Sequence, residues 1–400
     1  MSFPSSLAFR RADDDAAGPS DESSGMLKLV GPPSGSRSRA PWRLHLDFND
    51  RAALGMWAVA HVALFVLAWA AAWVFRSQTT HAPLTGVFEH WDASLFRNIA
   101  QYGYFSRNST PNSTAMFPGY PMTLAAAHLI LRNWVLAELI VPAVAGCFAV
   151  VSLSRLAGGR RAVLYLITMP AAIFLMVGYA ESLFLALAIP AWHAATRGRW
   201  WRAALLAGLA GLVREDAVFL ILALTVMALT GPRGRRIVNA AKCCCALAGP
   251  AAYELYLTVH SGWDTWSKAE QNGWDLHFAT PTQALKTTWW AAFQHPFSAA
   301  YSFEFQLELA AMVVMILATL AFLWRRRWPE AVYCALPVLS LGTQTWYHSG
   351  TRTLLVLFPI WVALAELEAR RPWVRYAYLS VAAPLAAVLG LLFLSYQWAG

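Results

Sequence analysis

The 400-residue chain is apolar and sparsely charged. Hydrophobic residues make up 58% of it, charged residues only 13%, and the mean hydropathy is +0.43, whereas a soluble globular domain is about 25% charged. Residues 1–51 carry seven basic and seven acidic side chains, so the net charge of +9 belongs to residues 52–400. This pattern excludes a soluble enzyme, argues against a nucleic-acid-binding protein and indicates a polytopic membrane protein with basic loops.

Residues 1–50 are predicted to form a disordered tail, because they are rich in Ser, Pro, Gly, Asp and Arg and lack periodic apolar residues. No short apolar region begins the chain, so we expect no cleavable signal peptide. The first span is predicted at about 52–75, which is long enough to cross a bilayer. Arg43 and Arg51 precede it, and the positive-inside rule therefore places the tail in the cytoplasm. The predicted domains are this tail and a transmembrane domain at 51–400.

Basic clusters divide the rest of the chain. If every cluster is cytoplasmic, neighbouring clusters must be separated by an even number of crossings. The clusters are Arg155/Arg160/Arg161, Arg197/Arg199/Arg202, Arg233/Arg235/Arg236, Arg325–Arg327 and Arg370/Arg371/Arg375. The apolar runs between them meet this condition, at about 162–177, 180–195, 203–213, 217–230, 238–259 and 306–324, with two runs flanking Gln344–Arg352 and a last span at 376–396.

The stretch 117–154 fits this scheme less simply. It holds two apolar runs separated by Arg132 and Asn133, and parity favours one full crossing plus a re-entrant or interfacial piece. The sequence therefore predicts an all-α, polytopic transmembrane helix bundle of about ten to twelve helices.

Polar residues collect on the predicted outer face. They are loop 76–116, Glu181, Arg214/Glu215/Asp216, loop 260–304 and His348/Arg352. Several lie at apolar depth, where each charge costs about 2.5–3.5 kcal/mol on insertion scales. Charges kept at such depth are usually paired and often functional, although Arg214–Asp216 could also form no more than a short outer hairpin.

The first outer loop contains the string HWDASLFRNIAQYGY, from His90 to Tyr104. Its apolar residues have the spacing of an amphipathic helix that lies in the membrane interface. Asp92 stands at the start of this helix. It could act as a general base, or it could simply cap the helix N-terminus.

The string HWDASLFRNIAQYGY, followed by FPGYP, resembles the first luminal loop of the GPI mannosyltransferase II (PIG-V-like) family. The segment Tyr179-Ala180-Glu181-Ser182-Leu183-Phe184 is similar to a second motif of that family, and His348–Pro359 is similar to a late Arg-containing one. The matches are in register along most of residues 50–370. Arg214-Glu215-Asp216 departs from the family pattern, which suggests a different acceptor.

This resemblance implies a GT-C glycosyltransferase, with interfacial helices in its first outer loop and Asp92 as the catalytic base. Such an enzyme transfers a mannosyl residue from polyprenyl-phosphate-mannose to a glycolipid or glycan acceptor, with inversion, on the non-cytoplasmic face. His90, Trp91 and Glu181 are then expected to bind substrate. The expected location is the plasma membrane of a bacterial cell, as a multi-pass protein among membrane lipids.

The leaving group of that reaction is a lipid phosphate, which needs positive charge rather than protonation. Arg352, His348 and Arg214 are predicted to supply it, and Arg can hold a phosphate through two hydrogen bonds. We therefore expect no metal ion and no other cofactor. His90 could instead only cap or stack, Glu181 could only hold a helix break, and His348 could be an ordinary interfacial histidine.

The tryptophans outside these motifs bear on ligand binding. Most of the 20 tryptophans lie near predicted span ends, but Trp263, Trp266 and Trp274 in the second outer loop are better candidates for sugar or lipid contact.

Two other classes of protein stay open: a transporter or flippase of a lipid-linked sugar, and a non-catalytic scaffold that has no need of Asp92.

Overall fold

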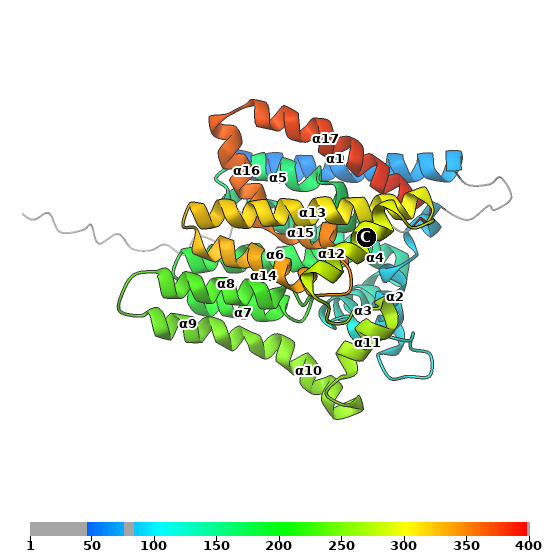
Figure 1. Cartoon of the computed structure of the whole chain (residues 1–400), viewed down its shortest axis with the longest axis horizontal. Coiled ribbons are helices and arrows are strands. Elements are labelled where there is room, and N and C mark those ends of the chain that lie inside the picture. Colours follow the sequence, from blue (N-terminus) through cyan, green and yellow to red (C-terminus); the bar gives the residue numbers. More distant parts are fainter. Residues whose placement is uncertain (1–45, 76–83, 398–400) are drawn as a thin grey trace, which may run out of the picture. The chain divides into compact units, whose positions relative to one another are not determined.

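A computed structural model describes residues 46–75 and 84–397 (Figure 1). The predicted tail lies outside the described residues, apart from residues 46–50, of which residues 48–50 already belong to the first helix. The described residues form 17 α-helices, of which the first nine are α1 (Phe48–Ala70), α2 (Asp92–Tyr102), α3 (Gly119–Leu131), α4 (Trp134–Leu156), α5 (Arg161–Ile167), α6 (Glu181–Thr196), α7 (Trp200–Ala210), α8 (Ala217–Thr230) and α9 (Arg236–Cys244).

The remaining helices are α10 (Ala248–Ser261), α11 (Thr265–Trp274), α12 (Pro281–Phe293), α13 (Ala299–Trp324), α14 (Trp328–Gly342), α15 (Gly350–Val356), α16 (Phe358–Arg370) and α17 (Trp373–Leu394). Short helical turns lie between them: η1 (Ala71–Phe75), η2 (Leu84–Phe88), η3 (Ser113–Ala115), η4 (Pro170–Leu175) and η5 (Cys245–Leu247). Within 46–75 and 84–397 the only strand-like pairing is one isolated bridge between Phe278 and Gln344. The predicted all-α class is confirmed.

Among residues 46–75 and 84–397, four helical segments are long and apolar enough to cross a membrane, and one bent pair could form a fifth span. The segments are Phe48–Trp73, Trp134–Leu156, Ala299–Trp324 and Trp373–Leu394, and the pair is α15 with α16, which meet at 64°. The chain is thus a multi-pass membrane protein.

Ten to twelve helices were predicted, but many of the apolar runs form helices that are too short to cross a membrane alone. The run predicted at 162–177, for example, is divided between α5 and η4, because Pro170 starts a new helical turn after an extended Met169.

The first helix shows how local sequence and packing agree. Asp47 caps α1 with a reciprocal capping box to Asp50, and the buried carboxylate of Asp50 pairs with Arg155 at 2.7 Å. Trp57 donates to the carbonyl of Ala143 on α4 at 2.9 Å. A Cβ on Gly146 would come within 2.0 Å of the Trp57 ring, so this close approach of α1 to α4 requires glycine.

The stretch 117–154 forms one short apolar helix and one helix that is long enough to span a membrane. Helix α3 has 13 residues and is too short to cross a bilayer alone, whereas α4 has 23 and qualifies as a span. The two helices are separated by Arg132, whose backbone is left-handed at φ 53°, and by Asn133, which caps α4. The polar pair therefore turns the chain between the two apolar runs.

The described helices run between two ends of the bundle in Figure 1. The connections α8–α9, α13–α14 and α16–α17, which carry three of the basic clusters, lie together at its left end, and α2 and α11 lie toward the other end. The fold therefore separates these three arginine-rich connections from α2 and α11, which carry part of the sequence-predicted site.

Candidate functional site

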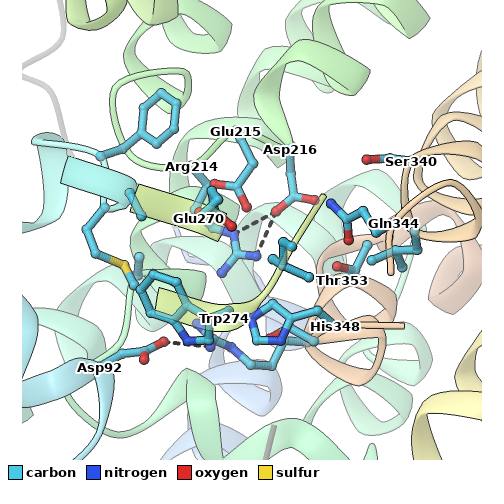
Figure 2. Close-up of a pocket in the computed structure, with 18 of the residues that line it drawn as sticks. Asp92, Arg214, Glu215, Asp216, Glu270, Trp274, Ser340, Gln344, His348 and Thr353 are labelled. Atoms are coloured by element: carbon cyan, nitrogen blue, oxygen red, sulfur yellow. Dashed lines mark hydrogen bonds and ion pairs between the residues drawn. The ribbon is translucent and has the colours of Figure 1, made fainter. Parts of the chain in front are cut away.

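A cavity of about 420 Å³ lies where four segments meet: the start of α2, the α7–α8 connection, α11, and the stretch from the end of α14 to α15 (Figure 2). Its polar lining consists of Asp92, Arg214, Glu215, Asp216, Glu270, Ser340, Gln344, His348, Ser349, Arg352 and Thr353. Its aromatic lining consists of Trp91, Phe96, Phe117, Phe219, Trp266, Trp274 and Tyr301. Residues that are far apart in the sequence thus share one pocket.

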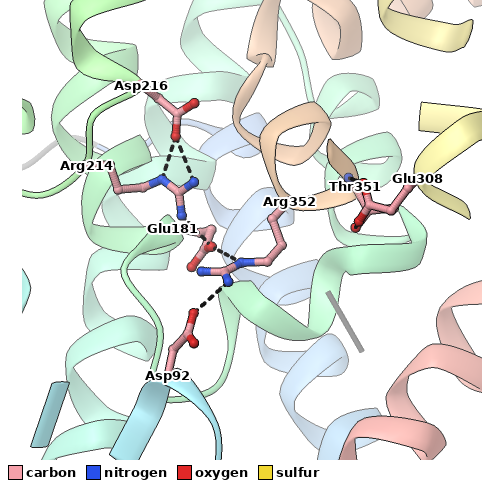
Figure 3. A network of polar contacts seen from close by, with 7 residues as sticks. All are labelled: Asp92, Glu181, Arg214, Asp216, Glu308, Thr351 and Arg352. Carbon is pink, nitrogen blue, oxygen red and sulfur yellow. Dashed lines mark hydrogen bonds and ion pairs between the residues drawn. The ribbon is translucent and has the colours of Figure 1, made fainter. Parts of the chain in front are cut away.

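Five charged side chains form a continuous chain of ion pairs at this cavity (Figure 3). Arg352 donates from Nη1 to Asp92 Oδ2 and from Nε to Glu181 Oε1, each at 2.7 Å. The same Glu181 oxygen accepts from Arg214 Nη1 at 2.6 Å. Arg214 in turn pairs with Asp216 Oδ2 at 2.7 Å. Four sequence-predicted site residues, Asp92, Glu181, Arg214 and Arg352, are therefore joined to one another.

Glu181 is the centre of this chain. It is the first residue of α6 and is completely buried. Its Oε1 bridges both arginines, while its Oε2 has no hydrogen-bond partner in the part of the chain that the structure describes. Removing one partner of a buried ion pair typically costs about 3–5 kcal/mol. Glu181 therefore holds two guanidinium groups in fixed positions, which is more than the helix-break role considered as its alternative.

Aromatic rings fix the other side of the Arg352 guanidinium. Its Cζ lies 4.8 Å from the ring centre of Tyr179 and 5.2 Å from that of Phe174, within the range of a cation–π contact. Tyr179 and Glu181 belong to the same motif and contact the same arginine. This explains physically why an aromatic residue and a carboxylate stand two positions apart at this place.

The backbone at the start of α2 aims Asp92 at Arg352. Trp91 precedes it with φ 54° and ψ −135°, an uncommon backbone conformation for a non-glycine residue. Asp92 is the first residue of the helix and Trp91 is its N-cap, without a side-chain cap hydrogen bond. The alternative in which Asp92 caps the helix is therefore wrong, since its carboxylate pairs with Arg352.

His90 does not line the cavity. Its Nε2 lies 2.8 Å from the carbonyl oxygen of Phe393 on α17, and its ring packs against the rings of Phe393 and Tyr396, each 4.5 Å away. The structure thus places His90 against the end of the last helix, while its neighbour Trp91 does line the cavity.

His348 lines the cavity but is not a cation there. Burial, and then the charge of Arg352, lower its pKa to about 3, so the imidazole is neutral at pH 7. Its ring lies 4.8 Å from that of Trp346 and 6.2 Å from that of Trp274, and among the described residues its Nδ1 has no hydrogen-bond partner. At pH 7 the neutral His348 therefore does not supply the positive charge that was expected of it.

Helix α11 contributes residues that the sequence analysis did not assign together. Trp266, Glu270 and Trp274 are spaced by four residues, share one face of the helix and line the cavity. Trp263 lies outside the pocket lining and is 81% exposed. The four-residue spacing of Glu270 from both tryptophans could have identified it in the sequence as a residue of the same helix face.

Two carboxylates face the cavity in addition to the ion-pair chain (Figure 2). Burial and then the nearby Glu215 and Asp92 raise the pKa of Glu270 to about 8. Burial and then the neighbouring Asp216 also raise the pKa of Glu215. Among the described residues, no cluster of three or more His, Cys, Asp or Glu side chains has the arrangement of a metal site.

Fold and site together define a multi-pass α-helical membrane protein with a carboxylate–arginine network at a polar, aromatic-walled cavity. No family model matches the chain. It is 31% identical over 153 residues to GPI alpha-1,6-mannosyltransferase 2 of Homo sapiens and, equally, of Rattus norvegicus. Each match covers 34% of this chain and only 30% of the relative.

One solved structure resembles the chain over more of its length. It is an oligosaccharyltransferase of Archaeoglobus fulgidus, with a TM-score of 0.39 and 13% sequence identity, covering 87% of this chain and 53% of the other. At this TM-score the likeness does not establish a common fold.

Proposed function

We propose that this protein is a membrane glycosyltransferase of the GT-C type, which moves a mannosyl residue from polyprenyl-phosphate-mannose to a hydroxyl group of a glycolipid or glycan acceptor. The observation that carries the proposal is the ion pair between Asp92 and Arg352 at the wall of the cavity. The named activity of the partly matching relatives supports the sugar and the reaction class.

Asp92 is the proposed general base. Its Oδ2 is held by Arg352, and its Oδ1 has no side-chain hydrogen-bond partner among the described residues. In the proposed step the acceptor oxygen forms a bond to the anomeric carbon and its proton passes to Asp92. The bond from that carbon to the phosphate oxygen breaks, and the electron pair leaves with the lipid phosphate. Displacement from the opposite face inverts the anomeric centre.

Arg352 is proposed to stabilise the departing phosphate. Its described hydrogen bonds use Nε and Nη1, which leaves Nη2 for an anionic ligand. A guanidinium that is fixed by Glu181 and by two aromatic rings needs little rearrangement when charge develops on the leaving oxygen. Arg214, whose nitrogens pair with Glu181 and Asp216, is proposed to hold Glu181 in place, and the neutral His348 to donate a hydrogen bond.

The aromatic wall suits a sugar ring. Trp266 and Trp274 offer large, flat apolar surfaces in the same cavity as Asp92, and Trp91 adds a third indole to its wall. We further propose that the cavity opens on the non-cytoplasmic face of the plasma membrane and that transfer needs no metal ion.

The proposal is tested with purified protein in liposomes, polyprenyl-phosphate-[³H]mannose, a chelator and a panel of lipid and glycan acceptors. We expect a labelled product with a new α-glycosidic bond, identified by linkage analysis, and equal yield with and without the chelator. A chelator-sensitive yield would contradict metal independence alone. Donor that crosses the bilayer while no new bond forms would contradict the proposal and support a flippase.

A further inference from the structure

Glu308 is a buried carboxylate that lies outside the cavity lining. It belongs to the membrane-spanning helix α13 and is completely buried. An acidic side chain is costly inside a membrane span and is usually kept there for a function. The contacts of its carboxylate therefore indicate its role.

All described hydrogen bonds of the Glu308 carboxylate go to the first two residues of α15. Oε2 accepts from the backbone N–H of Gly350 at 2.5 Å and from that of Thr351 at 3.3 Å. Oε1 accepts from the Thr351 hydroxyl at 3.2 Å. The next residue along the chain is Arg352, and Figure 3 shows Glu308 and Thr351 on the far side of this arginine from Asp92.

The backbone before Arg352 is shaped for this contact. Ser349 has a left-handed backbone at φ 52°, and a Cβ on Gly350 would lie 2.7 Å from Glu308 Oε2. Glycine at position 350 therefore permits the close approach of the carboxylate. The start of α15 is tied to α13, and its third residue is tied to Asp92 and Glu181.

We propose that Glu308 is a positioning residue, which fixes the start of α15 so that Arg352 reaches Asp92 and Glu181. Its predicted effect on sugar transfer rests on the proposed function, but its effect on the position of α15 does not. Glu304, one turn earlier on the same helix, is equally buried and its two carboxylate oxygens have no hydrogen-bond partner in the described part of the chain. It is thus a matched control for burial and charge.

The first test needs no activity. Thr353 lies on α15, lines the cavity and is 7% exposed. In a chain with its five native cysteines replaced, the reaction of Thr353→Cys with a small thiol reagent reports the position of α15. We expect Glu308→Leu to change this rate at least about tenfold and Glu304→Leu to change it less than about twofold. Equal labelling rates in the Glu308→Leu and Glu304→Leu variants would overturn the proposal.

Two further variants keep this test decisive if Glu308→Leu does not fold. Gly350→Ala places a methyl group against Glu308 Oε2 and should change the labelling rate in the same direction. Glu308→Gln keeps a carbonyl oxygen as acceptor for the N–H groups of Gly350 and Thr351, and should label like the parent protein. Normal labelling of Gly350→Ala would contradict the proposal.

The second test measures transfer. A misplacement of about 1 Å can cost about 100-fold in rate, so Glu308→Leu should lower kcat by up to that factor, with a smaller change in KM, while Glu308→Gln restores most of it. Altered labelling in Glu308→Leu without transfer by the parent protein would overturn the proposed function and leave the positioning role intact. Unaltered labelling would overturn the positioning role whether or not transfer is seen.

Discussion

The ion pairs at the cavity differ in burial from the ion pairs that Arg327 forms at the basic end of the bundle. At the cavity, Glu181 is shared by two arginines, and the side chains of Arg214 and Arg352 are each only 8% exposed. At the other end, Arg327 pairs with Glu330 and with Glu366, whose side chain is 47% exposed. Exposed pairs contribute about 0–1 kcal/mol, whereas a buried pair offsets a large desolvation cost. The difference teaches that the cavity network is retained for the position of its charges more than for net stability.

The largest expected effect comes from breaking the centre of the cavity network. Glu181→Ala leaves two buried guanidinium groups without their shared partner, and the free energy of unfolding should fall by about 3–5 kcal/mol. Denaturant unfolding in detergent, followed by tryptophan fluorescence, measures this loss. A loss below about 1 kcal/mol would mean that the cavity network behaves like the exposed pairs.

A smaller effect is expected when Arg352 is replaced by lysine, whose ammonium group is a single point charge. Arg352→Lys cannot reach Glu181 and Asp92 together and also loses the planar contact with Tyr179. We expect the variant to remain folded and its transfer rate to fall about 100-fold. The matched control is Arg327→Lys at the other end of the bundle, which should leave the rate within about twofold.

The pH dependence of stability should also distinguish the cavity. The pKa of Glu270 is raised in the folded state, so folding binds a proton there, and the stability contributed below pH 4.5 is lost as the pH rises to about 8. The corresponding slope is at most about 1.4 kcal/mol per pH unit. Unfolding measured from pH 5 to 8 should be flatter for Glu270→Gln than for the parent protein.

The control for this prediction is Asp264, which lies just before the same helix and pairs with the exposed Lys268. Its pKa is lowered, first by the hydrogen bond with Lys268, so Asp264→Asn should not alter the slope between pH 5 and 8. An equal change in both variants would show that the raised pKa of Glu270 is not the cause.

The smallest effect belongs to the exposed pair. Glu366→Gln should lower the free energy of unfolding by less than about 1 kcal/mol, and added salt should reduce the difference further. Unfolding at low and at high ionic strength checks this. A loss as large as that of Glu181→Ala would remove the contrast between the cavity network and the Arg327 pairs.

Much of the site was predictable because sequence spacing and topology carry it. Glu181, Arg214 and Arg352 interrupt apolar runs at places where parity brings the chain to the face that also carries the Asp92 loop. The structure joins all four side chains. The helical class follows from the apolar runs themselves, and the break at Pro170 explains why the run at 162–177 became two short helical segments.

The rest depended on contacts between distant segments. His90 faces away from the cavity because its partner is a backbone carbonyl 303 residues away, which no local pattern encodes. Glu308 lies within an apolar helix, and its role depends on where α15 begins. The charge state of His348 could not be predicted from the sequence either, because its neutral state follows from its burial beside Arg352.

The most direct test of the central claim is single-turnover transfer by Asp92→Asn, with donor binding measured on the same samples. Asp275→Asn is the matched control, because the Asp275 side chain is 78% exposed and asparagine tolerates the left-handed backbone at this position. We predict that Asp92→Asn binds the donor but transfers at least about 100-fold more slowly, while Asp275→Asn transfers normally. Equal transfer by both variants would remove Asp92 from the chemistry and contradict the account.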